Sequence, residues 1–279
     1  MTPRVAVVTI AHGRHRHLER QHASLAASSV LPEMHVVVAM DDVVLERWRP
    51  DGPLRTQVLR SPTGRHGLPL AAARNRGFEH AIAAGADVVI GLDVDCLVGP
   101  RTVAGYRDAV RDQPDVLWSG PVTYLPREAR ECALEDLAEL DAPHPARPAP
   151  RPGERTLDGN PDLFWSLSFA AHATGWAAVG GFCEEYVGYG AEDTDLGWSW
   201  AASGRSLGWV GDARAYHQHH ESENPPVQHL DDIVRNGEVF ARRWGRWPME
   251  GWLAQFEQMG LVSREPDGSW VRTASEAAR

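Results

Sequence analysis

Apolar, β-branched runs alternate with helix-like segments through the first hundred residues of the chain. The segments between the runs, at about 14–29 and 70–84, carry apolar residues at helical spacing. Strands that alternate with helices of this length form a parallel sheet with helices on its faces. The sequence therefore predicts an α/β fold with a mostly parallel central sheet. The predicted strands of this half lie at residues 5–10, 34–40, 57–59 and 88–92.

The second half of the chain has a weaker pattern. A further helix is expected at about 101–112, and a further extended segment at 116–118. Residues 142–153 are rich in Pro, Ala and Arg, which predicts a loop or a disordered excursion. Residues 231–256 are rich in aromatics and have mostly helical spacing, and about the last 15 residues are expected to be frayed.

Composition excludes several classes of protein. The net charge of −10 disfavours a nucleic-acid-binding surface, which is usually basic. All 28 Lys and Arg residues are arginine, which excludes a Schiff-base lysine or a P-loop lysine. Cys96, Cys132 and Cys183 are too few and too scattered for a disulfide framework or a Cys-rich zinc site. Because no long apolar segment suits a secretion signal or a membrane span, we predict a cytoplasmic protein.

Two carboxylates follow the last of these four runs. The run at 86–90 continues into Gly91-Leu92-Asp93-Val94-Asp95-Cys96, so that Asp93 and Asp95 lie where the strand ends. Ligands of open α/β sheets bind at the carboxyl ends of the strands. Carboxylates placed there suit a hard divalent cation, and such a cation suits a phosphate-bearing substrate.

The ends of the first two strands suit a nucleoside. Thr9-Ile10-Ala11-His12-Gly13-Arg14 leaves the first strand, and its small residues allow a flat ligand to approach the backbone. Asp41 and Asp42 follow the second strand, where a carboxylate can accept hydrogen bonds from a base or a ribose. An ordinary strand-to-helix turn and a helix N-cap are the alternative interpretations of these two segments.

Arg74 lies in a segment of small residues, Leu70-Ala71-Ala72-Ala73-Arg74-Asn75-Arg76-Gly77. A guanidinium on such a thin segment can make a forked contact with a diphosphate. The alternative is an exposed helix arginine, an interpretation that fits Arg76 better than Arg74.

Glycines and aromatics precede a group of acids in Gly188-Tyr189-Gly190-Ala191-Glu192-Asp193-Thr194-Asp195. The acids also fit the first turn of a helix, where the helix dipole favours negative charge. Further along, Tyr216-His217-Gln218-His219-His220 offers three imidazoles to a cation already held by a carboxylate. A solvated histidine-rich loop is the alternative interpretation.

In this order, the segments resemble nucleotide-sugar-dependent glycosyltransferases of the GT-A fold. The N-terminal half is similar to family 2 glycosyltransferases. The stretch from about 168 to 217 is similar to the C-terminal module of β1,4-galactosyltransferases, chondroitin polymerases and polypeptide N-acetylgalactosaminyltransferases. Those families carry a Trp-Gly-Gly-Glu-Asp-like loop, in which Tyr189 and Ala191 of this chain replace a tryptophan and a glycine.

The resemblance implies a domain organisation. We expect a GT-A domain over residues 1–222, with a nucleotide-binding half at 1–98 and an acceptor and catalytic half at 99–222. A helical C-terminal extension is expected over 223–279.

The resemblance also implies a role for each candidate residue. Asp95 would bind Mn²⁺ or Mg²⁺, with Asp93 on the ribose or on the metal through water. His217 would complete the protein ligands, with His219 as the second choice and His220 also left open. The nucleotide-binding residues would be Thr9, Ala11, Arg14, Asp41, Asp93 and Arg74, with Arg74 assisting at the diphosphate.

The acid-rich loop would supply the catalytic residues. Asp193 matches the general base of inverting members and Glu192 a ligand of sugar hydroxyls, while Trp165, Tyr189 and Gly190 would contact sugar or acceptor. The predicted reaction moves a sugar, from a UDP-sugar by preference, to a hydroxyl of a saccharide, natural product or glycolipid precursor. A sugar-phosphate nucleotidyltransferase and a non-catalytic sugar-binding protein are the alternatives, and the oligomeric state is left open.

Overall fold

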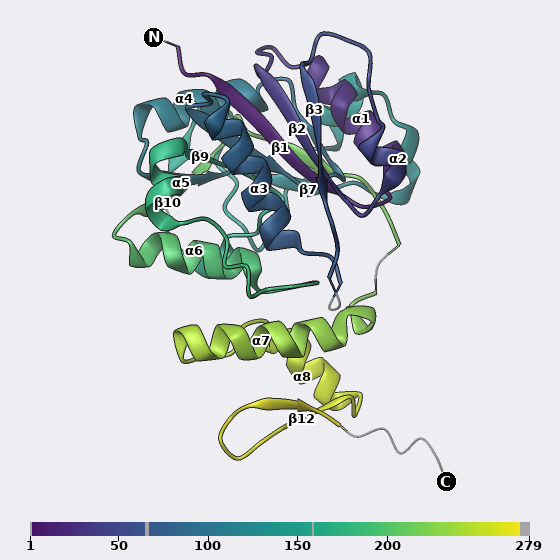
Figure 1. The fold of residues 1–279 in the computed structure, drawn as a ribbon, viewed down its shortest axis with the longest axis vertical. Helices are drawn as coiled ribbons and strands as arrows, with labels where there is room; N and C mark the ends of the chain where they lie inside the picture. Colours follow the sequence, from purple (N-terminus) through teal and green to yellow (C-terminus); the bar gives the residue numbers. More distant parts are fainter. Residues whose placement is uncertain (1, 65–66, 158, 222, 274–279) are drawn as a thin grey trace.

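An eight-stranded sheet forms the centre of the described part of the protein (Figure 1). The structure is a computed structural model and describes residues 2–64, 67–157, 159–221 and 223–273. Across the sheet the strands are, in order, β3 (Thr56–Ser61), β2 (Met34–Met40), β1 (Val5–Ala11), β4 (Val88–Leu92), β9 (Ser168–His172), β6 (Val116–Ser119), β10 (Ser206–Val210) and β8 (Arg155–Thr156).

The strand directions confirm a mostly parallel sheet. Strands β3, β2, β1 and β4 run parallel to one another, and β6 runs parallel to β10. Strand β9 is antiparallel to both of its neighbours, β4 and β6, and β8 is antiparallel to β10. All four strands predicted in the N-terminal half are present, and the run at 57–59 extends to the full length of β3.

Helices cover both faces of this sheet, because alternate residues of a buried strand point to opposite sides. Val5 and Val7 of β1 belong to the core shared with α1 (His15–Ala26) and α4 (Thr102–Asp112). Ala6 and Val8 belong to the core shared with α3 (Leu70–Ala83), α5 (Ala173–Val179) and α6 (Glu192–Ala202). None of the helices in the described ranges combines the length and the apolar character that a membrane span requires.

A second, three-stranded sheet lies beyond the end of β4. It consists of β5 (Cys96–Val98), β11 (Ala215–His217) and β7 (Val122–Tyr124), with β11 in the middle. The remaining short elements are α2 (Val43–Glu46) and the 3₁₀ turns η1 (Arg127–Glu131), η2 (Leu134–Leu140), η3 (Pro161–Leu163) and η4 (Val227–His229).

The C-terminal segment forms a small module with its own core. Helices α7 (Leu230–Trp244) and α8 (Glu250–Gln258) account for the predicted helical region. A hairpin of β12 (Val262–Arg264) and β13 (Trp270–Arg272) follows them, so the expectation of a frayed end is wrong for these residues; 274–279 lie outside the described residues. The core of this module consists of Leu230, Ile233, Leu253, Phe256, Val262 and Trp270.

Candidate functional site

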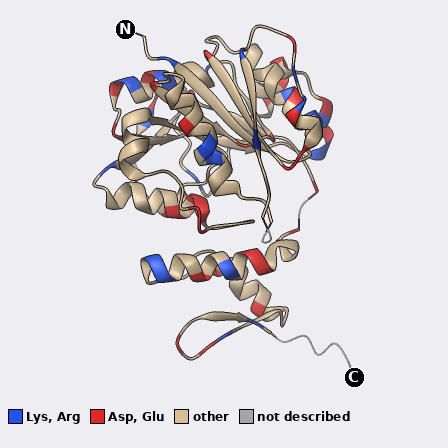
Figure 2. Cartoon of the chain, viewed as in Figure 1, with Lys and Arg blue, Asp and Glu red and all other residues tan. Residues whose placement is uncertain are grey.

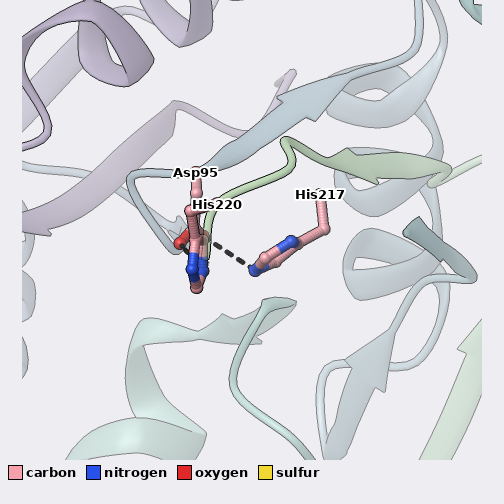
Figure 3. Close-up of side chains that lie close together, drawn as sticks. All are labelled: Asp95, His217 and His220. Atoms are coloured by element: carbon pink, nitrogen blue, oxygen red, sulfur yellow. Dashed lines mark ion pairs between the residues drawn. The ribbon is translucent and has the colours of Figure 1, made fainter. Parts of the chain in front are cut away.

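Asp95, His217 and His220 form a candidate metal site just beyond the end of β4 (Figure 3). Asp95 Oδ1 lies 3.4 Å from His217 Nε2, and Asp95 Oδ2 lies 3.4 Å from His220 Nε2. One ligand atom from each side chain lies within 4.8 Å of the other two. A carboxylate oxygen with two imidazole nitrogens suits Mn²⁺ and similar divalent metals.

Strand pairing brings these residues together from distant parts of the sequence. Strands β5 and β11 are antiparallel, and their register places Cys96 opposite His217. Asp95 immediately precedes Cys96, and its carbonyl accepts a 2.7 Å hydrogen bond from the Gln218 amide. The second sheet is therefore the element that positions the candidate metal ligands.

Of the three histidines at 217, 219 and 220, the geometry favours two as metal ligands. His217 and His220 face Asp95, whereas His219 is outside the group and its buried Nδ1 has no hydrogen-bond partner among the residues that the structure describes. Although burial opposes it, the hydrogen bond from His220 holds the pKa of Asp95 at about 2. Burial lowers the pKa of His217, which favours the neutral imidazole that a metal requires.

Arg74 bridges two acids at the centre of the site. Its Nη2 lies 2.9 Å from Asp93 Oδ1, and its Nη1 lies 3.1 Å from Glu192 Oε1. These contacts join α3, the end of β4 and the start of α6, and Figure 2 shows the basic positions on α3 and the acidic start of α6. Both terminal nitrogens of Arg74 therefore bind carboxylates of the protein, so the predicted contact with a diphosphate stays a prediction.

We expect Arg74→Met to lower the free energy of unfolding by about 3–5 kcal/mol, because Asp93 and Glu192 would lose their buried cation. Urea denaturation measures the change. Arg76→Met is the matched control on the same helix, since Arg76 is exposed, and should change stability by less than about 0.5 kcal/mol. Equal losses in the two variants would contradict this account of Arg74.

Glu192 and Asp193 are the first two residues of helix α6. Their position in the first turn of a helix, expected as the alternative interpretation, is compatible with a catalytic role. Glu192 is buried, and its Oε2 has no partner among the described side chains. Burial and the neighbouring charge of Asp193 raise the pKa of Glu192 to about 7. This buried oxygen is therefore an unused hydrogen-bond acceptor among the described residues.

Asp193 is oriented by backbone amides. Its Oδ1 accepts a 2.7 Å hydrogen bond from the Thr194 amide, and a second hydrogen bond links it to the backbone of Ser166. Burial nevertheless raises the pKa of Asp193, and the residue remains partly exposed. A carboxylate with a fixed orientation and a raised pKa is suited to accept a proton.

Aromatic rings extend from the metal ligands toward Asp193. The ring of Tyr124 stacks on His217 at 4.7 Å and stays 46% exposed. His144 contacts Tyr124 and Trp165 edge-on, at 5.6 and 5.3 Å. Tyr189 is 37% exposed, with one face of its ring stacked on His229. Trp165 and Tyr189 were predicted here from sequence; Tyr124 and His144 carry no sequence signal and were missed.

The nucleoside candidates have different environments. Thr9 is fully buried, and its hydroxyl bonds Gln21 and His35, so its side chain is structural. Ala11 is also buried, in the core beneath the loop. Asp41 is exposed at the end of β2, and its carboxylate accepts a hydrogen bond from Thr63.

The neighbouring Asp42 is a helix N-cap, which was the alternative interpretation of this segment. It caps α2 by accepting from the Val44 and Leu45 amides, and it also bonds Gly13 and His15. Arg14 has left-handed backbone angles, with φ of 55°, and its charge acts on Asp95. Asp41 and Arg14 therefore stay candidates for the nucleotide, whereas Asp42 shapes the loop that presents them.

Arg147 is a residue that sequence reasoning missed. It lies in the predicted loop at 142–153 but is buried, with its guanidinium over the rings of Trp165 and Trp209 at 5.2 and 4.7 Å. Within the described ranges, its Nε and Nη1 have no hydrogen-bond partner. The loop is therefore packed against the domain, and the Arg147 guanidinium covers one face of the Trp165 ring.

Comparison with known proteins identifies the fold. No family model matches the sequence, and no curated protein matches it. Among solved structures, GalNAc-T7 with UDP, GalNAc and Mn²⁺ is similar over 87% of this chain and 50% of its own, with a TM-score of 0.56 and 14% identity. TarS 1–349 of S. aureus with UDP-GlcNAc is similar over 85% of this chain and 66% of its own, with a TM-score of 0.57 and 14% identity.

A third similar structure is that of another sugar transferase. It is the mannosyltransferase PcManGT of Pyrobaculum calidifontis with GDP-Man and Mn²⁺, over 89% of this chain and 66% of its own, with a TM-score of 0.55 and 19% identity. The chain thus spans between half and two thirds of the length of these proteins. At these identities the likeness establishes the GT-A fold, as predicted from the sequence.

Proposed function

We propose that this protein is a metal-dependent glycosyltransferase that uses a nucleotide-sugar donor. The observation that carries the proposal is the Asp95–His217–His220 group beyond the end of β4, with Asp93 between this group and Asp193. Burial, and then the charges of Asp95 and Asp193, raise the pKa of Asp93. The similar structures named above hold UDP, UDP-GlcNAc or GDP-Man, two of them with Mn²⁺. These likenesses support a nucleotide-sugar donor, and we favour a UDP-sugar.

The residues present fit a divalent metal. Asp95, His217 and His220 would hold Mn²⁺ or Mg²⁺, which when bound neutralises the charge that develops on the departing nucleotide diphosphate. Asp41, Arg14 and the backbone near Ala11 would hold the nucleoside. Asp93 faces Arg74, and we assign it to the ribose or to a water on the metal.

Asp193 is the proposed general base. It would take the proton from an acceptor hydroxyl while that oxygen forms a bond to the anomeric carbon and the bond to the diphosphate breaks. Attack opposite the leaving group inverts the anomeric configuration. Glu192 would bind a hydroxyl of the donor sugar or of the acceptor through its free Oε2.

The acceptor we propose is a hydroxyl-bearing molecule with a ring. Exposed aromatic side chains stack on the apolar faces of sugar rings and of aromatic groups alike. Trp165 precedes Ser166, whose backbone bonds Asp193, while Tyr189 and Gly190 lie just before Glu192 in the chain and Tyr124 stacks on His217. These rings suit a saccharide, a natural product or a glycolipid precursor. The cytoplasmic location expected from the sequence stays a prediction.

A screen of nucleotide sugars tests the proposed function without knowledge of the acceptor. With Mn²⁺ present, slow hydrolysis of one donor and release of its nucleoside diphosphate are expected. Release of pyrophosphate from a nucleoside triphosphate would instead favour a sugar-phosphate nucleotidyltransferase. Failure of every UDP- and GDP-linked donor to bind in the presence of metal would refute the proposal.

The rate of donor turnover is expected to fall at acid pH, at a higher pH than an ordinary aspartate would give. Only the ionised base accepts a proton, and burial raises the pKa of Asp193 while that of Glu192 is raised to about 7. The two carboxyls titrate as a pair, so the profile of kcat/KM against pH reports their joint behaviour. An acid limb at about pH 4, the ordinary range for Asp and Glu, would contradict this reading.

A further inference from the structure

Helix α7 of the C-terminal module lies against the loop that leads to the proposed catalytic acids (Figure 1) and is hydrogen-bonded to it. We call residues 187–190 the catalytic loop. Asn236 of α7 is fully buried, and its Nδ2 donates to the carbonyl oxygens of Val187, Tyr189 and Gly190 at 3.1, 3.2 and 3.0 Å. One side-chain amide therefore holds three of the four carbonyls of the loop.

Asp232, one helical turn before Asn236, holds the loop from the same face. Its Oδ2 accepts a 3.1 Å hydrogen bond from the Tyr189 amide. Arg235 joins the two elements, donating to the Val187 carbonyl at 2.6 Å and to Asp232 Oδ1 at 2.7 Å. These bonds satisfy backbone groups that an irregular loop cannot pair within itself.

The sequence of the loop is adapted to this contact. Gly188 has a φ of 74°, and a Cβ atom there would lie 2.2 Å from Asp232 Oδ2. On its other side, the Gly188 amide donates to the Leu68 carbonyl at 2.9 Å. The loop is thus held between α7 and the turn that leads into α3, and only glycine fits at its centre.

The same helix also fixes the first turn of α6. Asp195 is 1% exposed, and its Oδ1 accepts hydrogen bonds from Arg243 and Trp244, both at 2.7 Å. Asp195 and the catalytic loop flank Glu192 and Asp193 in sequence on both sides. Helix α7 therefore holds the segments immediately before and after the two proposed catalytic acids.

The start of the module contacts a ring that faces the site. His229 stacks on Tyr189 with ring centroids 4.4 Å apart and planes 14° from parallel. Burial raises the pKa of Tyr189, as do the charges of Asp193 and Glu192, which places its phenol near those acids. The module thus orients Tyr189 as well as the acids.

We propose that the C-terminal module is part of the active site, with Asp232 and Asn236 as the positioning residues that hold the catalytic loop in its working conformation. The inference rests on the proposed function for the reaction it serves. The physical step is general: a misplacement of about 1 Å in a reacting group costs roughly a hundredfold in rate, even when its cause lies outside the site.

Donor hydrolysis by Asp232→Ala and Asn236→Asp tests the proposal. We expect kcat to fall about ten- to a hundredfold, with KM for the donor changing less than about threefold, since neither residue touches the nucleotide side. Asp231→Ala is the matched control, because Asp231 is the preceding acid of α7 and instead pairs with Arg272 at 2.9 Å. Gln255→Glu controls for the amide-to-acid change on an exposed side chain.

Amide hydrogen exchange separates this proposal from the proposed function. The Tyr189 amide should be protected in the unmodified protein and exchange faster in Asp232→Ala, but not in Asp231→Ala. Faster exchange together with unchanged kcat would overturn the positioning role, and unchanged exchange would overturn the contact itself. If no donor is hydrolysed by the unmodified protein, the proposed function fails while the exchange result still decides the contact.

Discussion

Replacing Asp193 by Asn is expected to lower turnover about 10²–10⁴-fold, the usual contribution of a positioned general base. An amide cannot accept the acceptor's proton, yet it keeps the size of the carboxyl and an oxygen for the Thr194 and Ser166 backbone hydrogen bonds. Metal-dependent nucleotide binding, measured by calorimetry with UDP and Mn²⁺, should remain nearly unchanged. The loss should therefore fall on kcat and leave donor affinity intact.

Two further variants sharpen this test. Asp115→Asn makes the same chemical change at an exposed acid before β6, at the opposite end of that strand from the site, and should leave turnover unchanged. Glu192→Gln removes a proposed hydroxyl ligand rather than the base, and should raise KM more than it lowers kcat. Near-normal turnover by Asp193→Asn would show that the base is another group.

Removal of the metal is expected to abolish both donor turnover and tight nucleotide binding. Chelation with EDTA, followed by titration of Mn²⁺ back into the protein, measures the first effect. His217→Ala and His220→Ala should each weaken the apparent affinity for Mn²⁺ by about tenfold or more. Loss of a residue that only hydrogen-bonds to a metal ligand already lowers metal affinity by about that factor. Asp95→Ala should have at least as large an effect, because it removes the only carboxylate of the group.

His219→Ala is the matched control for the metal experiment. It changes the same residue type within the same segment, but the imidazole lies outside the Asp95 group. Its apparent affinity for Mn²⁺ should match that of the unmodified protein. A loss in this variant that equals the loss in His217→Ala would contradict the assignment of the ligands.

Local patterns in the sequence were enough to predict the parallel half of the fold. Buried strands such as β1 and β4 are continuous apolar runs, and their order with the helices determines a parallel arrangement. The antiparallel strand β9 and the β12–β13 hairpin were not predicted. Their pairing partners are chosen by tertiary packing, and short mixed segments carry little periodic signal.

Site residues could be predicted from the sequence where the proposed chemistry requires a particular residue type, such as a carboxylate or an imidazole for a metal. Asp95, His217 and Asp193 were expected at a metal and base site; the structure brings Asp95 and His217 together, and the role of Asp193 stays a prediction. The choice of His220 over His219 depends on how the chain leaves β11, which no spacing rule gives. The capping role of Asp42 was foreseen as an alternative, and backbone geometry decided it.

Residues that act through contacts at long range were missed altogether. Asn236 reads as an ordinary polar residue of an amphipathic helix, yet it is the side chain that holds the catalytic loop. Arg147 lies in a stretch whose composition predicts a loop or a disordered excursion, and its burial against Trp165 and Trp209 was not foreseen. Arg74 was predicted as a diphosphate ligand, but its carboxylate partners, Asp93 and Glu192, lie 19 and 118 residues further along the chain, which no local motif shows.

The pairing of Cys96 with His217 makes chain length, rather than side-chain identity alone, a determinant of the metal site. Side chains alternate across a strand, so one inserted or deleted residue within β11 would turn His217 to the opposite face of its sheet. One inserted or deleted residue within β5 would instead shift Asp95 and Cys96 relative to His217. Insertions in the surrounding loops carry no such penalty. The two strands should thus be intolerant of length change, even where their apolar residues can be exchanged for others of similar size.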